Sequence, residues 1–130
     1  MQQLQFESSW EKALSTQDRD YIEKLFNDTK EQPHTTIVFS PIREAINHRN
    51  ELLITVLVHN FSQHPFTFDN TRLIYSNEQE VLAENVFTLP ILTIPPQVSM
   101  PWTFIFPVHQ GTIAQDGRLT VDFNYNASKF

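Results

Sequence analysis

The stretch LTIPPQVSMPWTFIFP, residues 92–107, decides the fold class of this sequence. From Val98 onward every second residue is apolar, as in a strand that buries one of its faces. Those residues are Val98, Met100, Trp102, Phe104, Phe106 and Val108. We therefore predict a strand whose inward face anchors a hydrophobic core through Trp102, Phe104 and Phe106.

Prolines mark the approach to this strand and one position inside it. Pro95 and Pro96 favour an extended polyproline II approach, and Pro101 cannot donate a hydrogen bond to a neighbouring strand. One interpretation is that the prolines protect an exposed sheet edge from aggregation. The other is that Pro95, Pro96 and Pro101 contact a partner, because a stiff segment loses little conformational entropy on binding. A groove of the SH3 type would bind such a segment.

Short apolar segments recur along the chain after Pro33, and they predict further strands. The predicted strands cover residues 35–40, 51–62, 65–70, 71–76, 81–89, 98–108 and 119–125. Turn signals separate them at 47–50, 76–80 and 115–118, the last with an Asp-Gly pair. About seven strands with turns at this spacing are typical of an immunoglobulin-like antiparallel β-sandwich.

Two of these strands predict which side chains face the core. In the strand at 81–89 the inward residues are Val81, Ala83, Phe87 and Leu89, with Asn85 interrupting that face. In the last strand they are Leu119, Val121, Phe123 and Tyr125.

The region before Pro33 predicts one amphipathic helix, over residues 16–29. Ser15 is its expected N-cap, and Asp18 lies three residues later, as in a capping box. The apolar residues at helical spacing are Tyr21, Ile22, Leu25 and Phe26. We expect this face to pack on the sandwich. The alternative is a detachable helix that binds a partner.

Length and composition are those of one ordered domain. The 130 residues suffice for a core without metal or disulfide, and there is no cysteine. We expect a single domain over 1–130, with a helical segment at about 10–30 and the sandwich at about 35–126. No signal peptide or membrane-spanning run is visible, so we expect a cytoplasmic protein. The net charge of −6 argues against nucleic acid as a partner.

No motif in the sequence indicates catalysis. The two glycines, Gly111 and Gly117, do not form a phosphate-binding loop, and the five histidines show no metal-ligand spacing. His59 and His64 are the nearest to a pair, and they read as turn or surface residues. We predict no catalytic residue, no metal and no cofactor.

Three segments of the chain carry a resemblance to a known family. They are WEKALSTQDRDYIEKLF, LITVLVHNFSQHPFTF and EQEVLAENVFTLPILTIPPQVSMPWTFIFP. The most specific residues are Phe87, Leu89, Leu92, Ile94, Pro95, Pro96, Ser99, Pro101, Trp102, Thr103 and Phe104, together with Asn60 and Ser62. Over about residues 10–125 the chain resembles the SLAP domain family, found in the accessory Sec system S-layer assembly protein of endospore-forming bacteria.

The resemblance implies a module without enzymatic activity that is associated with cell-surface assembly or export. The assembly protein resembles a tandem of two such modules, whereas this chain has a single copy. The leading hypothesis is therefore a protein-interaction or scaffolding module. The alternative is a small ligand-binding or inhibitor-like β-sandwich.

Overall fold

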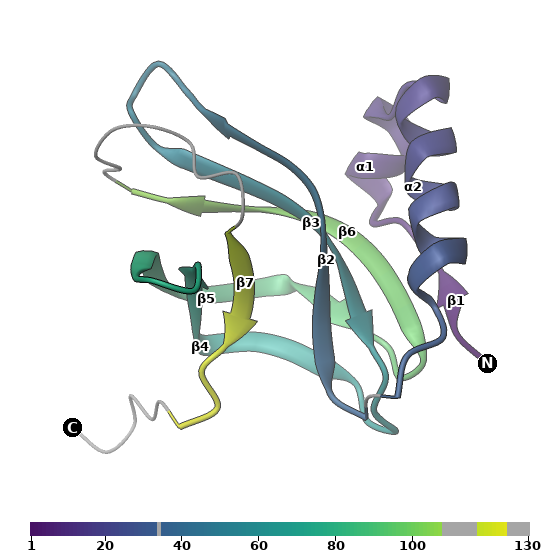
Figure 1. Ribbon diagram of the computed structural model, residues 1–130. Helices are drawn as coiled ribbons and strands as arrows, with labels where there is room; N and C mark the ends of the chain where they lie inside the picture. The colour runs from purple at the N-terminus through teal and green to yellow at the C-terminus, as the bar shows by residue number, and fades with distance from the viewer. Residues whose placement is uncertain (34, 108–116, 125–130) are drawn as a thin grey trace.

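The computed structural model of the protein describes residues 1–33, 35–107 and 117–124 (Figure 1). In chain order the elements are β1 (Gln3–Leu4), α1 (Ser8–Ala13), α2 (Thr16–Thr29), β2 (Ile37–Ile46), β3 (Leu52–Asn60), β4 (Phe66–Ser76), β5 (Val81–Ile94), β6 (Val98–Phe106) and β7 (Arg118–Val121). The mainly β class predicted from the sequence is confirmed.

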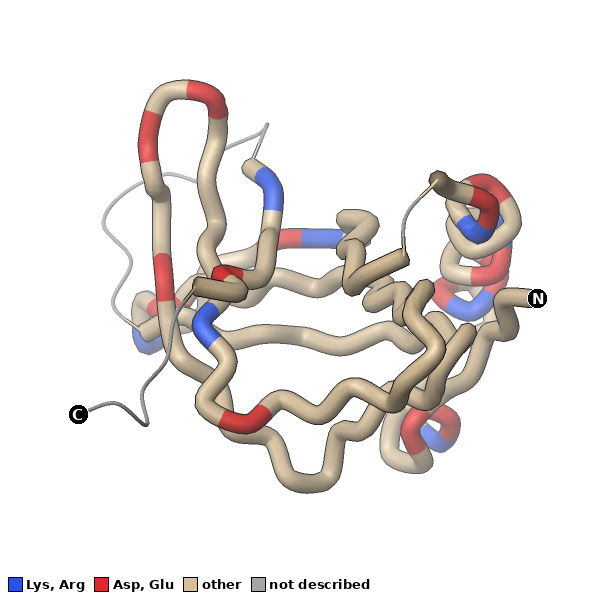
Figure 2. The backbone as a smooth tube through the Cα atoms, turned by 90° about the horizontal axis from the view of Figure 1, so that it is seen from below, with Lys and Arg blue, Asp and Glu red and all other residues tan. Residues whose placement is uncertain are grey.

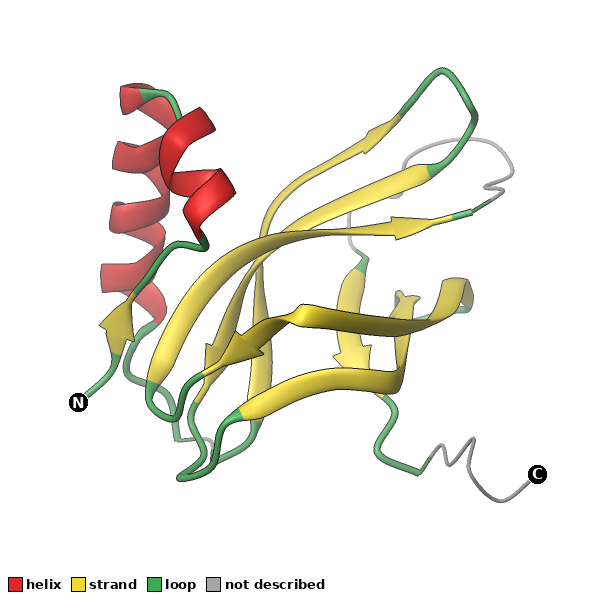
Figure 3. Cartoon of the chain, turned by 180° about the vertical axis from the view of Figure 1, so that it is seen from behind, coloured by secondary structure: helices red, strands yellow, loops and turns green. Residues whose placement is uncertain are grey.

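The strands form two sheets that pack face to face. The four-stranded sheet has the order β1-β6-β3-β2, and the three-stranded sheet has the order β5-β4-β7. Both helices lie on the outer side of the four-stranded sheet (Figures 1 and 3). The sandwich is thus confirmed, while its immunoglobulin-like character stays a prediction. One ladder departs from the antiparallel pattern, because β1 pairs with β6 in parallel.

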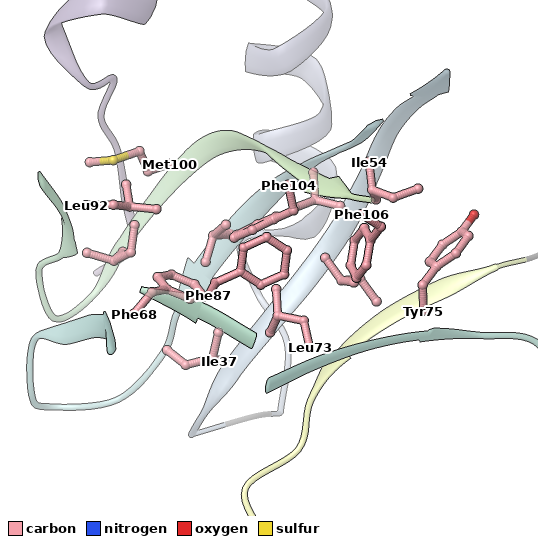
Figure 4. Packing of buried hydrophobic residues seen from close by; sticks show 14 of the residues in the cluster. Ile37, Ile54, Phe68, Leu73, Tyr75, Phe87, Leu92, Met100, Phe104 and Phe106 are labelled. Atoms are coloured by element: carbon pink, nitrogen blue, oxygen red, sulfur yellow. The ribbon is translucent and has the colours of Figure 1, made fainter. Parts of the chain in front are cut away.

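The core lies between the sheets, and β6 supplies its centre (Figure 4). Phe104 and Phe106 are each 1% exposed, whereas Trp102 is half-buried and packs against the same cluster. The Phe104 ring lies 5.3 Å from that of Phe68 on β4 and 5.2 Å from that of Phe87 on β5, centre to centre. Phe104 therefore joins the two sheets through aromatic contacts, which favour such tilted geometries. Val108, the last residue of the predicted face, lies outside the described residues.

Pro101 occupies a position in β6 where a missing N–H costs no sheet hydrogen bond. The amide of Gln5 donates to the carbonyl of Ser99, at 3.0 Å, on the side of β6 away from β3. Because backbone groups of alternate residues point the same way, Pro101 also directs its nitrogen to that side, beyond the end of β1. This part of β6 is an edge, which is where proline is tolerated.

The N-terminal layer, residues 1–33, packs on the outer face of the four-stranded sheet. Ser15 caps α2 as predicted, since its hydroxyl accepts a hydrogen bond from the amide of Asp18 at 3.1 Å. Buried Ile22 and Phe26 pack with Leu57 of β3. Their burial supports the packed helix over the detachable one.

Two features of this layer differ from the prediction. The sequence predicted one helix, but α1 precedes α2 and brings Trp10 against the same apolar cluster as Leu57. Tyr21 was expected to pack on the sandwich and is 51% exposed. Since Trp10 and Leu14 fill the neighbouring side of the cluster, Tyr21 is left at its rim.

Several strands run past the boundaries that prolines and polar residues predicted. β2 continues through Pro41, with a register shift between Pro41 and Arg43. The segments 65–70 and 71–76 form one strand, β4, which bulges between Phe68 and Thr71. β5 likewise continues to Ile94. The reason is common to all three: a bulge absorbs the irregular residues while pairing resumes beyond them.

Two residues predicted to face the core are exposed instead. Val81 is 56% exposed beside the turn that joins β4 and β5, and Phe123 is 64% exposed. The predicted strand at 119–125 ends at Val121, so Phe123 lies in a turn and not on a pleated face. Tyr125 and most of the Asp-Gly turn at 115–118 lie outside the described residues.

We expect Phe104→Ala to lower the free energy of unfolding by about 3–5 kcal/mol, because it empties the contact between the sheets. The matched control is Ile105→Ala, one residue along β6, where the side chain is 45% exposed. That change should cost less than about 1 kcal/mol. Denaturant unfolding measures both values, and equal losses in the two variants would contradict the central role of Phe104.

Candidate binding cleft

A cleft of about 780 Å³ lies between β2 and β7, where the edges of the two sheets separate. Its apolar lining comes from both sheets. The residues are Ile37, Phe39, Ile54, Val56, Leu119 and Val121. Except for Phe39 and Val121, which are half-buried, these residues are buried members of the main core. The cleft therefore gives access to the hydrophobic interior from one side of the sandwich.

Some backbone N–H and C=O groups of β2 face this cleft. They do not bond to β3, which is the one strand in the described chain that pairs with β2. The carbonyl of Thr36 accepts from the amide of Phe61, at 3.1 Å, at the β3 end of the ladder. Alternation then directs the backbone groups of Ile37 and Phe39 to the opposite, open side. Pro41 is the next residue whose backbone faces this side, and as a proline it has no N–H that could donate to another strand. The open edge is thus short and ends at a proline.

One polar contact crosses the cleft between the sheets. The hydroxyl of Tyr75 on β4 donates to a carboxylate oxygen of Glu44 on β2, at 2.6 Å. The ring of Tyr75 passes directly over the backbone of Gly117, where a side-chain Cβ would lie 2.2 Å from the Tyr75 Cζ atom. A residue with a side chain would collide there, so Gly117 permits the close approach of β4 and β7.

The rim of the cleft combines an exposed aromatic ring with charged groups. Phe123 is on the lining, and so are Arg43, Glu44 and Arg118. Many of the other charged residues lie on the two helices (Figure 2). The exposed Phe123 ring extends the apolar surface of the cleft to its rim.

The three prolines proposed as a partner contact do not form one surface. Pro96 is exposed, Pro95 is half-buried, and Pro101 is buried. The approach to β6 is a tight turn in place of the predicted polyproline II segment, with Gln97 in the left-handed region at φ 62°. The side chain of Gln97 holds that turn by donating to the carbonyls of Phe61 and Ser62, at 2.9 and 3.1 Å.

The outer face of the four-stranded sheet contains a buried polar network centred on His59. The ring is fully buried, with Nδ1 2.6 Å from the hydroxyl of Ser99 on β6. Its Nε2 lies 2.9 Å from the hydroxyl of Ser40 on β2 and 3.1 Å from that of Thr29 on α2. Burial lowers the pKa of His59 from 6.5 to about 4, because water is absent to solvate the charged ring. His59 is therefore neutral at pH 7.

Asn60, the next residue, is also fully buried and connects two loops, the one after β3 and the one between β5 and β6. Its amide nitrogen donates to the carbonyls of Ile94 at 2.9 Å and Pro95 at 3.2 Å, on the link between the two sheets. The same nitrogen donates to the carbonyl of His64, and its oxygen accepts from Ser62. The sequence placed His59 and Asn60 at the end of a strand, but it gave no signal that either is a network centre.

A comparison with known protein families then places the chain. The model of the SLAP domain matches residues 4–120. The chain belongs to the SLAP domain family. The match includes both helices, the ladder that contains His59 and Asn60, and the β2 side of the cleft, and it ends within β7, before Val121 and Phe123. No curated protein and no solved structure matches this SLAP domain.

Two further features of the SLAP domain concern metal binding and membrane spanning. Within the described residues, no three acidic or histidine side chains gather closely enough to hold a metal ion. Neither of the described helices is long and apolar enough to cross a membrane. That the domain is without metal, cofactor or catalytic residue stays a prediction.

We expect Gly117→Ala to destabilise the SLAP domain by about 1–3 kcal/mol, because the new methyl group must displace the buried Tyr75 ring. Thr120→Ala, at an exposed position on the same strand, is the control and should change stability by less than about 0.5 kcal/mol. Thermal unfolding compares the two. An unchanged melting temperature for Gly117→Ala would show that the Tyr75 ring is not fixed.

Proposed function

We propose that this SLAP domain works by binding another protein, without turnover, as a scaffolding module in cell-surface (S-layer) assembly or export. Membership of the family supports the connection with assembly. The proposal places the domain in the cytoplasm, as the sequence predicts.

The observation that carries the proposal is the cleft between β2 and β7. It combines an apolar floor with the side of β2 at Ile37 and Phe39 that pairs with no other strand among the described residues. An extended segment of a partner protein uses both features together, since its backbone pairs with an edge strand and alternate side chains enter pockets. Phe123 on the rim adds an aromatic contact of the kind that dominates binding energy in interfaces.

A small apolar ligand is the second candidate for the same cleft. The volume of about 780 Å³ lies within the range of small-molecule sites, which are mostly apolar with a few fixed polar groups. The Tyr75–Glu44 pair would supply such polar groups. We favour a protein, because a small ligand would leave the strand edge of β2 unused.

Site-specific photocrosslinking in cells that naturally contain the chain tests the proposal. The photoreactive amino acid replaces Phe123 on the cleft, Pro96 on the exposed turn, or Glu23 on the exposed face of α2 as the control. We expect position 123 to give one discrete protein adduct and position 23 to give none. Adding Leu119→Glu, which places a charge on the cleft floor, should remove the adduct at 123.

The other outcomes decide between the alternatives. A discrete adduct at Pro96 and none at 123 would move the contact to the proline turn that the sequence suggested. Absence of a protein adduct at both positions, combined with a rise in melting temperature on adding small apolar compounds, would favour the ligand-binding sandwich.

A further inference from the structure

His59 links two parts of the N-terminal layer, the end of α2 and the residues before β1, to the four-stranded sheet through polar groups. From α2, Thr29 contacts Nε2. Gln2, just before β1, donates to Ser99 at 3.0 Å, and Ser99 contacts Nδ1. Ser40 of β2 completes the contacts, and the ring stacks on Phe61 with centres 5.1 Å apart. One imidazole ring therefore contacts two of the places where the layer meets the sheet, beside the β1–β6 ladder and the apolar cluster around Leu57.

The hydrogen bonds of this network assign the neutral tautomer. The hydroxyl of Thr29 donates to the carbonyl of Leu25, at 2.6 Å, so it must accept from His59. This requires the proton on Nε2, and Nδ1 then accepts from Ser99, whose hydroxyl in turn accepts from Gln2. A second proton on Nδ1 would reverse this bond, so that the ring donates to Ser99 and the fully buried hydroxyl proton of Ser99 loses its acceptor.

No carboxylate among the described residues compensates a charge on this ring. The elements packed against it present hydroxyl groups from β2, β6 and α2, and an amide from β1. The charged residues that flank Thr29 turn elsewhere: Asp28 is exposed, and the amino group of Lys30 lies over the Phe26 ring. The end of α2 favours a cation, but the carbonyls of Leu25, Phe26 and Thr29 there already accept hydrogen bonds.

We propose that His59 is a pH-sensitive latch, so that protonation of its ring releases the N-terminal layer, residues 1–33, from the four-stranded sheet. Release gives the ring access to water, which the closed network excludes. With the layer released, the His59 ring takes up a proton as pH falls below 6.5, whereas with the layer docked it does so only near pH 4. Docking is therefore strongest above pH 6.5 and weakens as pH falls toward 4. This latch is independent of the cleft and of its occupant.

Hydrogen exchange followed by mass spectrometry, corrected for intrinsic exchange, tests the latch in the full chain. Between pH 7.5 and pH 5 the protection of α2 amides should fall about thirtyfold, the ratio that the two pKa values give. A released helix of this length is marginal in water, so its amides exchange. The central amides of β3 should keep their protection, because the main core does not contain His59.

His59→Gln keeps an amide donor for Thr29 and does not titrate, so the pH dependence of α2 should disappear. His48→Gln, at an exposed histidine in the turn between β2 and β3, is the control and should behave as wild type. Equal loss of protection in α2 and β3 of the wild type, or an unchanged α2, would overturn the proposal. Should His59→Gln not fold, an NMR titration of the wild-type ring decides: a pKa near 6.5 with α2 still protected also overturns it.

Discussion

The side-chain amide of Asn60 is the contact on which the arrangement of the two sheets depends. The chain leaves the three-stranded sheet at Ile94 and enters the four-stranded sheet at Val98, so only three residues cross between them. Asn60 binds two carbonyls of that crossing from the end of β3. Buried carbonyls without a partner are costly, and this amide supplies donors where water cannot reach. The crossing therefore starts β6 in the one register that turns Phe104 and Phe106 toward the core.

Once β6 is placed, the exposed edges of the sandwich must be kept from pairing with other chains. Both long edge strands contain a proline, Pro41 in β2 and Pro90 in β5, and Pro101 lies in the part of β6 that β1 does not cover. β2 and β5 also shift register beside their prolines. Prolines and bulges are the devices by which natural sheets prevent edge-to-edge aggregation. The short open run at Ile37 and Phe39 stands out against this protection, and it lies beside the apolar cleft.

The features that could be predicted from the sequence are those that depend on the residues of a single strand or helix. Alternation in β6 reports burial on one side, so the core residues Phe104 and Phe106 and the sandwich class could be read directly, as could the cap of α2 at Ser15. The cleft could not be predicted, because its walls come from β2 and β7, which are distant in the chain and unpaired. His59 was read as a surface residue for a similar reason: it points outward from its sheet, and only the N-terminal layer buries it.

The two outer faces of the sandwich differ in polarity, and only one of them is covered by the N-terminal layer. The outer face of the four-stranded sheet is apolar at Leu57 and needs the N-terminal layer as a cover. The outer face of the three-stranded sheet has Arg72 at its centre, paired with Glu84 on β5 and with Asp122 just after β7. Charges that pair across three strands stay in contact with water and need no cover. The cleft at the sheet edges is the apolar surface that we propose for a partner. His59 pairs with Val38 of β2 in the same part of the ladder, but its ring lies on the opposite face of the sheet, where we propose that it holds the cover in place.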